Sequence, residues 1–291
     1  MARPLRIEFP GAVYHVTSRG GGRQPVFADD ADRLGFLGTV AQALSRFDGQ
    51  MLAYCLMGTH YEFVLHTRQA NLSLLMRHIN GLYTQSFNRR HGKVGNVFQG
   101  RFKAILVDRD AYLLDVCRYV ELSPVRAKMV KRPEAWPWSS YRAHAGKAEA
   151  PVWLDTDGLH SFALGRPVRN AADRRRGAQR YAELVASAKA ESPWETGLRQ
   201  QIYLGDESFV ERMQALAQPQ NSTDRDVPKA RRRKALTLGQ WLKACETREE
   251  AYYRAHTEGA MSMSDIAREL GYSVSHVSRL IAKAERDKHK A

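Results

Sequence analysis

The hydrophobic residues in the first half of the chain follow two alternating periods. Short runs rich in β-branched and aromatic residues predict strands at 12–18, 50–57, 61–67 and 103–107. Apolar residues spaced three and four apart predict helices at 28–47, 71–90 and 109–122. This order of strands and helices favours an α+β sandwich with a small antiparallel sheet.

The second half of the chain is more polar and has a mainly helical pattern. A basic amphipathic segment covers 172–188, and 205–216 begins with acidic residues, as helices prefer. Residues 217–234 are polar, contain proline and end in a basic cluster, which is typical of a linker. We therefore expect an α+β domain at 1–146, a helical extension at 147–220, a basic linker at 221–236 and an all-α domain at 237–291.

Two short amphipathic segments surround Gly271 near the end of the chain, within 261–285. A helix, a glycine-containing turn and a second helix form the helix-turn-helix plan of DNA-binding domains. The residues expected to face bases and phosphates are Ser275, His276, Ser278 and Arg279. A plain packing hairpin has the same pattern and remains the alternative.

The composition adds a strong charge bias. The 291-residue chain has a formal net charge of +14 and a pI near 9.9. This balance favours a polyanionic partner, with nucleic acid ahead of an anionic membrane surface. No apolar run is long enough for a membrane span, and the N-terminus lacks the apolar core of a signal peptide. Cys55, Cys117 and Cys245 show no zinc spacing, so we expect reduced thiols in a cytoplasmic protein.

The run LMGTHYEFVLHT carries the first candidate chemistry. Side chains alternate across a strand, so His60 and Glu62 share one face. An imidazole and a carboxylate together suit Mn²⁺ or Mg²⁺. A hydrogen-bonded structural histidine is the alternative, and the spacing alone favours it.

The predicted helix 109–122 carries the second candidate, Tyr119, and Ser123 follows one turn later. A tyrosine beside a divalent cation can attack a phosphodiester and form a phosphotyrosine link. A helix tyrosine taken alone is more often a packing residue.

Four motifs, in this order, resemble the single-tyrosine HUH transposases, and most closely the REP-associated tyrosine transposases. They are YHVTSRGGGRQPVF, YCLMGTHYEFVLHT, FNRRHGKVGNVFQGRFKAILV and RYVELSPVRAKMV. The resemblance covers roughly residues 1–145. It implies a ferredoxin- or RRM-like sandwich, a pair of metal-binding histidines on a central strand, and a tyrosine nucleophile on a helix. Members cleave and rejoin single-stranded DNA next to hairpins.

Carried onto this sequence, the resemblance makes His60 the first histidine of the pair and Tyr119 the nucleophile. Glu62 stands where the family has its second histidine, and Ser123 stands where it has a polar amide. We expect His60, Glu62 and Ser123 to hold Mg²⁺ or Mn²⁺, with His15 on the first strand either approaching the site or making a structural hydrogen bond.

Two functions are compatible with these residues. The chain is either a metal-dependent DNA strand transferase or a non-catalytic DNA-binding regulator with a degenerate site. RNA binding through the sheet is a third hypothesis.

Basic residues are expected to supply the remaining nucleic-acid contacts. They are Arg19, Arg23, Arg89, Arg90, Lys93, Arg101, Lys103, Arg231, Arg232 and Arg233. Phe87, Phe98 and Phe102 lie among them and suit stacking on single strands, although each alone is more often a core residue. The expected partners are single-stranded DNA hairpins and, through the C-terminal helices, duplex DNA, in a cytoplasmic, nucleoid-associated protein. Family members occur as monomers and as dimers, so a homodimer stays open.

Overall fold

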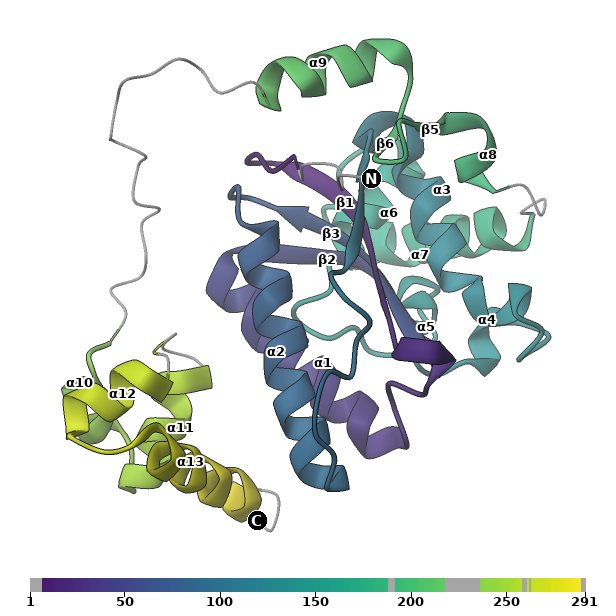
Figure 1. Ribbon diagram of the computed structural model, residues 1–291. Helices are drawn as coiled ribbons and strands as arrows, with labels where there is room; N and C mark the ends of the chain where they lie inside the picture. The colour runs from purple at the N-terminus through teal and green to yellow at the C-terminus, as the bar shows by residue number, and fades with distance from the viewer. Residues whose placement is uncertain (1–6, 188–191, 218–235, 258–260, 262, 289–291) are drawn as a thin grey trace. The chain divides into compact units, whose positions relative to one another are not determined.

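A computed structural model describes residues 7–187, 192–217, 236–257, 261 and 263–288 (Figure 1). The chain divides into two compact units, Met1–Asn221 and Ser222–Ala291. Among the helices of the described ranges, none combines the length and apolar character that crossing a bilayer requires.

The first unit contains all the strands of the described chain. They are β1 (Ala12–Arg19), β2 (Gly49–Leu56), β3 (His60–Thr67), β4 (Lys103–Val107), β5 (Leu198–Arg199) and β6 (Tyr203–Leu204). Its helices are α1 (Asp30–Phe47), α2 (Leu72–His91), α3 (Arg109–Glu121), α4 (Ser123–Arg126), α5 (Tyr141–His144), α6 (Thr156–Leu164), α7 (Ala171–Ala186), α8 (Pro193–Gly197) and α9 (Glu207–Ala217), with short 3₁₀ turns at Gly21–Arg23 and Pro133–Ala135. The expected α+β class is confirmed.

The six strands form one sheet in the order β2-β3-β1-β4-β6-β5. The first four are antiparallel to their neighbours, and β6 joins β4 in parallel. Because side chains alternate across each strand, the sheet buries two separate cores. On β3, Tyr61 and Phe63 pack with α1 and α2, whereas Val64 packs with α3, α6 and α7 on the other side (Figure 1). Glu62 has the same parity as Val64 and therefore faces α3.

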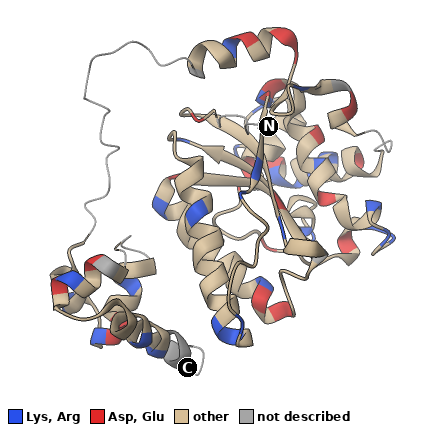
Figure 2. Ribbon diagram, in the orientation of Figure 1, with Lys and Arg blue, Asp and Glu red and all other residues tan. Residues whose placement is uncertain are grey.

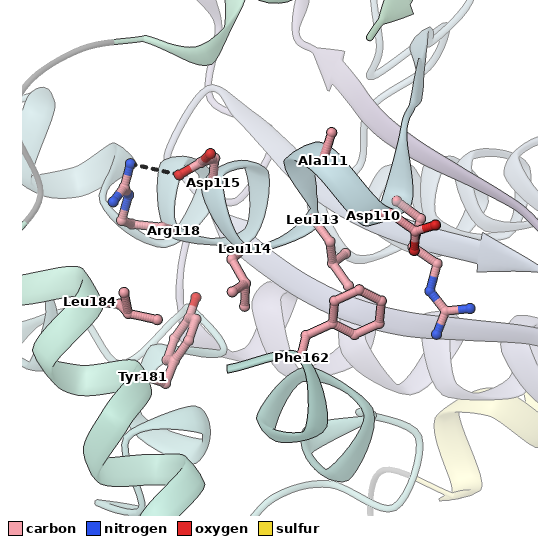
Figure 3. Close-up of a pocket in the computed structure, with 10 residues that line it drawn as sticks. Asp110, Ala111, Leu113, Leu114, Asp115, Arg118, Phe162, Tyr181 and Leu184 are labelled. Carbon is pink, nitrogen blue, oxygen red and sulfur yellow. Dashed lines mark ion pairs between the residues drawn. The ribbon is translucent and has the colours of Figure 1, made fainter. Parts of the chain in front are cut away.

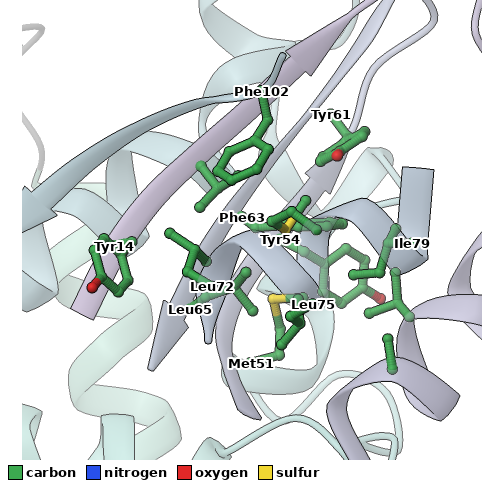
Figure 4. Packing of buried hydrophobic residues seen from close by; sticks show 14 of the residues in the cluster. Tyr14, Met51, Tyr54, Tyr61, Phe63, Leu65, Leu72, Leu75, Ile79 and Phe102 are labelled. Carbon is green, nitrogen blue, oxygen red and sulfur yellow. The ribbon is translucent and has the colours of Figure 1, made fainter. Parts of the chain in front are cut away.

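Aromatic and aliphatic side chains pack together in the core between the sheet and the α1–α2 pair (Figure 4). The ring of Phe36 on α1 lies 4.9 Å from that of Tyr61 and 5.9 Å from that of Phe63. Each such ring contributes about 1.5–3 kcal/mol on burial. This packing fixes β3 firmly, and with it the strand that carries His60 and Glu62.

Helix α3 is held at both ends. Asp108 caps its N-terminus by accepting hydrogen bonds from the backbone of Asp110 and Ala111. Near its C-terminus the fully buried Glu121 accepts hydrogen bonds from Tyr181 on α7, at 2.8 Å, and from Ser140 next to α5. The helix that carries Tyr119 is therefore anchored to the layer of helices behind it.

The extension at 147–220 differs from its expected all-helical character, because it adds β5 and β6 to the sheet. Each strand is two residues long, too short to display the alternation that identifies a strand in a sequence. The pairing also depends on β4, which lies far away in the chain.

The second unit contains four helices within the described ranges. They are α10 (Leu238–Ala244), α11 (Arg248–Thr257), α12 (Met263–Leu270) and α13 (Val274–Lys288). Trp241, Tyr252, Ile266 and Val277 share its core. Gly271 joins α12 to α13 with φ of +70°, a left-handed conformation that glycine adopts without strain.

Candidate functional site

The candidate site begins where β3 and β1 lie side by side. On β3, the Nε2 atom of His60 lies 3.4 Å from Oε1 of Glu62. On β1, the Nε2 atom of His15 lies 3.3 Å from Oε2 of the same carboxylate. Glu62 pairs directly with Thr17 on β1, so His15 is its diagonal neighbour two residues along. His15 on the first strand was expected either to approach the site or to make a structural hydrogen bond. The structure places it at the site.

Helix α3 and the turn after it bring the second half of the site to this carboxylate. The hydroxyl of Ser123 donates to Oε1 of Glu62 at 3.0 Å. Tyr119 lies one helical turn earlier and lines the same cleft as His60 and Glu62. Four residues predicted from the sequence, His60, Glu62, Tyr119 and Ser123, therefore converge from two distant segments.

Arg126 on α4 ties Tyr119 to Ser123. Its guanidinium donates to the hydroxyl of Ser123 at 2.8 Å and to the backbone carbonyl of Tyr119. The same group lies 3.5 Å from the centroid of the Tyr119 ring, in cation–π contact. The sequence analysis missed Arg126, because this residue lies beyond the predicted helix 109–122 and belongs to the separate helix α4.

Two opposing effects set the charge of Glu62. Burial by itself raises the pKa of this carboxyl, because the anion loses solvation. Hydrogen bonds and charge interactions with His15 and His60 outweigh burial and lower the pKa to about 2. Glu62 is therefore ionised at neutral pH, which suits a cation ligand and not a proton acceptor.

These residues line a cleft of about 1160 Å³. Three of the basic residues expected to contact nucleic acid, Arg19, Arg101 and Lys103, also line it. All three are exposed, and Figure 2 marks the Lys and Arg positions along the ribbon. At the cleft wall, Gly20 cannot be replaced without a clash, since a Cβ there would lie 2.3 Å from the carbonyl oxygen of Gln24. The cleft thus combines an anionic carboxylate, imidazoles, a tyrosine and a cationic rim.

Comparison with protein families gives this arrangement a context. A family described as "Transposase IS200 like" matches residues 9–123. We call residues 9–123 the IS200-like domain, after the family that they match. The resemblance to transposases inferred from the four motifs is confirmed over this range of the chain.

Other comparisons are more distant. Among solved structures, one similar to the chain is a REP-associated tyrosine transposase bound to a REP hairpin. It is 15% identical, the match covers 53% of this chain and 91% of that chain, and the TM-score is 0.45. No curated protein matches the chain.

Other predicted nucleic-acid contacts lie away from the cleft of the IS200-like domain. Arg89, Arg90 and Lys93 sit at the end of α2 and just after it, and none of them lines the cleft. Arg90 donates to Asp29 at 2.7 Å and also bonds Asp32, so acidic neighbours already compensate its charge. The side chain of Arg23 and residues Arg231, Arg232 and Arg233 lie outside the described residues.

The three phenylalanines of the basic region belong to the core of the IS200-like domain. Phe87, Phe98 and Phe102 are 4%, 6% and 8% exposed. The core interpretation therefore holds for Phe87 and Phe98, and only Phe102 also borders the cleft. A stacking surface made of all three is wrong, because the sheet and α2 pack over two of the rings.

Trp194 is a site residue that the sequence analysis missed. It belongs to α8, outside the IS200-like domain, yet it lines the cleft. Its ring stacks on His15 with centroids 4.7 Å apart and lies 5.4 Å from the ring of Tyr119 at near-perpendicular orientation. The sequence did not place Trp194 at the site, because its contacts depend on the pairing of β6 with β4, which are far apart in the chain.

A second, smaller cavity of about 250 Å³ lies between α3, α6 and α7 (Figure 3). Its lining includes Phe162, Tyr181 and the ion pair of Arg118 with Asp115, whose charged atoms are 2.9 Å apart. None of the predicted site residues borders it. His60, Glu62 and Tyr119, three of the candidate catalytic and metal-binding residues, line the larger cleft instead.

The expected DNA-reading residues of the second unit lie at the start of α13. Ser275 and Arg279 are exposed, and His276 and Ser278 are half-buried. The exposed Tyr272 packs its ring on that of His276, 4.8 Å away. Ile266 and Val277 face the core, as the amphipathic pattern predicted.

Proposed function

We propose that this chain cleaves and rejoins single-stranded DNA beside hairpins through a phosphotyrosine intermediate on Tyr119, as a REP-associated type of transposase. The observation that carries the proposal is the 3.0 Å hydrogen bond from Ser123 to Glu62. It joins the helix of Tyr119 to the strand of His60 and Glu62, inside an IS200-like domain and at a cleft with a cationic rim.

The reaction balances as a phosphoryl transfer. The Oη atom of Tyr119 bonds to phosphorus as the bond from phosphorus to the 3′ oxygen breaks. The phenol loses its proton and the departing 3′ oxygen gains one, which leaves a 5′-phosphotyrosine and a free 3′-OH. Because the ester bond is exchanged and not hydrolysed, a 3′-OH can reverse the step and rejoin the strand.

The donor set fits Mg²⁺ or Mn²⁺ bound in part by the substrate. His60 supplies an imidazole nitrogen and Glu62 an ionised carboxylate, and hard cations accept both. Among the residues that the structure describes, no three His, Cys, Asp or Glu side chains form a complete metal-binding group. A cation that keeps several waters and takes phosphate oxygens as ligands, as Mg²⁺ does, needs no complete protein cage. When bound, it would offset the negative charge of the reacting phosphate.

The protein's own groups would hold and orient the DNA. Arg19, Arg101 and Lys103 supply positive charge along the cleft, and such contacts follow the phosphate backbone with strong salt dependence. The exposed Ser275 and Arg279 on α13 would contact duplex DNA in the major groove.

A labelled hairpin oligonucleotide with a single-stranded flank tests the proposal. Incubation with Mn²⁺ or Mg²⁺ should give a covalent adduct on a denaturing gel, and Tyr119→Phe should abolish it. Tyr112→Phe is the matched control, since Tyr112 lies on the same helix seven residues earlier and should leave the adduct in place. Absence of an adduct on every hairpin, or equal adduct with Tyr119→Phe, would refute the enzyme assignment.

A non-catalytic DNA-binding regulator is the second candidate. The observation that favours it is the replacement of a histidine by Glu62, whose carboxylate already engages both His15 and His60. In that case His60→Ala and Tyr119→Phe would bind a specific DNA as tightly as the wild type, and no adduct would form. Competition between DNA and RNA hairpins distinguishes these two DNA-binding functions from RNA binding, since only RNA carries the 2′-OH.

A further inference from the structure

Trp194 lies outside the IS200-like domain and yet contacts two residues of its candidate site. Its indole is half-buried at the wall of the cleft that holds His60 and Glu62. A residue of the extension at 147–220 therefore forms part of the cleft wall.

The two ring contacts of Trp194 are of different kinds. Its ring lies nearly flat on His15, with an interplanar angle of 30°, and His15 in turn bonds Glu62. Its ring meets that of Tyr119 at 84°, the edge-to-face geometry that aromatic pairs favour. One indole thus touches both the proposed nucleophile and a partner of the proposed metal-binding carboxylate.

The Tyr119 ring has a second contact on its face, the guanidinium of Arg126. The cation and the indole together restrict rotation of the ring about its side-chain torsions. Attack on phosphorus requires the phenol oxygen to sit within a few tenths of an ångström of the productive position, so this restriction matters.

The short helix α8 is itself firmly placed. β6 continues the sheet beside β4, where the amide of Leu106 donates to the carbonyl of Ile202 at 2.8 Å. Gly197 ends α8 directly against α3, where a Cβ would lie 2.8 Å from the ring of Tyr112. The backbone that carries Trp194 is therefore fixed to the same sheet and helix that carry the site.

We propose that Trp194 is a positioning residue of the transposase site, which holds the rings of Tyr119 and His15 in their reactive arrangement. The extension is then part of the site, and the IS200-like domain is incomplete without it. The expected effect of Trp194 on catalysis rests on the proposed function. Its effect on the position of the Tyr119 ring does not, and can be measured separately.

The first test compares Trp194→Ala with Trp153→Ala in the full chain. Trp153 is the matched control, because it is also half-buried and packs on a tyrosine, Tyr54, at 5.5 Å, away from the cleft. Trp194→Ala should slow adduct formation at saturating hairpin by about ten- to a hundredfold, with the hairpin Kd within twofold of wild type. Trp194→Phe should recover most of the rate, and Trp153→Ala should leave it unchanged.

The second test needs no activity. A fluorotyrosine placed at position 119 should give one narrow ¹⁹F resonance, and Trp194→Ala should shift and broaden it while Trp153→Ala does not. A wild-type protein that forms no adduct refutes the proposed function, and the fluorine signal then still decides whether Trp194 places the ring. A Trp194→Ala rate within twofold of wild type, a faster rate, or an unchanged resonance overturns the inference.

Discussion

Two buried glutamates, Glu62 and Glu121, have nearly the same partners and very different surroundings. Glu62 accepts hydrogen bonds from Ser123 and faces His15 and His60 at the wall of the large cleft. Glu121 accepts from Ser140 and Tyr181 and lies 2.6 Å from Nδ1 of His144, with both members of this acid–imidazole pair fully buried. Similar groups thus line an open cleft in one place and join buried helices in the other.

Access to water and substrate separates the two carboxylates. Two partners of Glu62, His15 and His60, border an open cleft, so water can replace the hydrogen bonds that they make. The partners of Glu121 have no such replacement, and a buried polar group without a partner is costly. Glu62 should therefore affect activity more than stability, and Glu121 stability more than activity.

The largest expected effect comes from Glu121→Ala. Removing one member of a buried ionic network costs about 3–5 kcal/mol of unfolding free energy, which corresponds to a Tm lower by about 10 °C in a unit of this size. Thermal unfolding followed by circular dichroism measures it, with Glu183→Ala on the exposed face of α7 as the control. A Tm within about 2 °C of wild type would show that the buried Glu121 network contributes little to stability.

Glu62→Gln should affect activity more than stability, the opposite of Glu121→Ala. The neutral amide keeps the size of the side chain but loses the charge that attracts a cation, and its nitrogen cannot accept a hydrogen bond. We expect adduct formation to fall at least about a hundredfold, equivalent to about 2.7 kcal/mol of transition-state stabilisation, while Tm falls by less than it does in Glu121→Ala. Retained activity, or a loss of Tm like that of Glu121→Ala, would contradict the comparison.

The sequence identified one of these glutamates and not the other, for a physical reason. Glu62 stands out because alternation on one strand puts it beside His60, and because the motif around it resembles a known family. The Glu121 network joins residues 23 and 60 positions apart, so no local pattern reveals it. Trp194 is hidden in the same way, whereas the boundaries of β4 and α3 follow from local periodicity and capping and were predicted within one residue.

The two serines in these networks are oriented by different means. Ser140 is fixed by the backbone, since its hydroxyl accepts from the amide of Tyr54 at 2.9 Å. Ser123 is fixed by the guanidinium of Arg126, which leaves its proton directed at Glu62.

Arg126→Ala should therefore disturb the cleft and leave the buried Glu121 network intact. We expect adduct formation about tenfold slower, or about 1.4 kcal/mol, with an unchanged Tm. Single-turnover kinetics at saturating hairpin measures the rate, and Lys131→Ala, an exposed cation in the following loop, is the charge-matched control. If both variants slow the reaction equally, the loss reflects general charge and not the orientation of Ser123 and Tyr119.

The smallest expected effect concerns Cys117, which lies one turn before Glu121 on α3. Burial raises the pKa of this thiol well above its ordinary value, and the negative charge of Glu121 raises it further. The folded thiol therefore keeps its proton at alkaline pH, whereas the unfolded thiol ionises near pH 8.5. Between these two pKa values the unfolded state holds fewer protons, so the free energy of unfolding falls as the pH rises.

From pH 7.5 to 9.0 this thiol should remove about 0.8 kcal/mol of stability. Urea unfolding at the two pH values measures the change, and Cys117→Ala should show a decrease smaller by that amount, whatever its absolute stability. Equal pH dependence in the two proteins would mean that Cys117 ionises as readily in the fold as in the unfolded chain. The interior around Glu121 would then be open to water, and the contrast with the cleft of Glu62 would disappear.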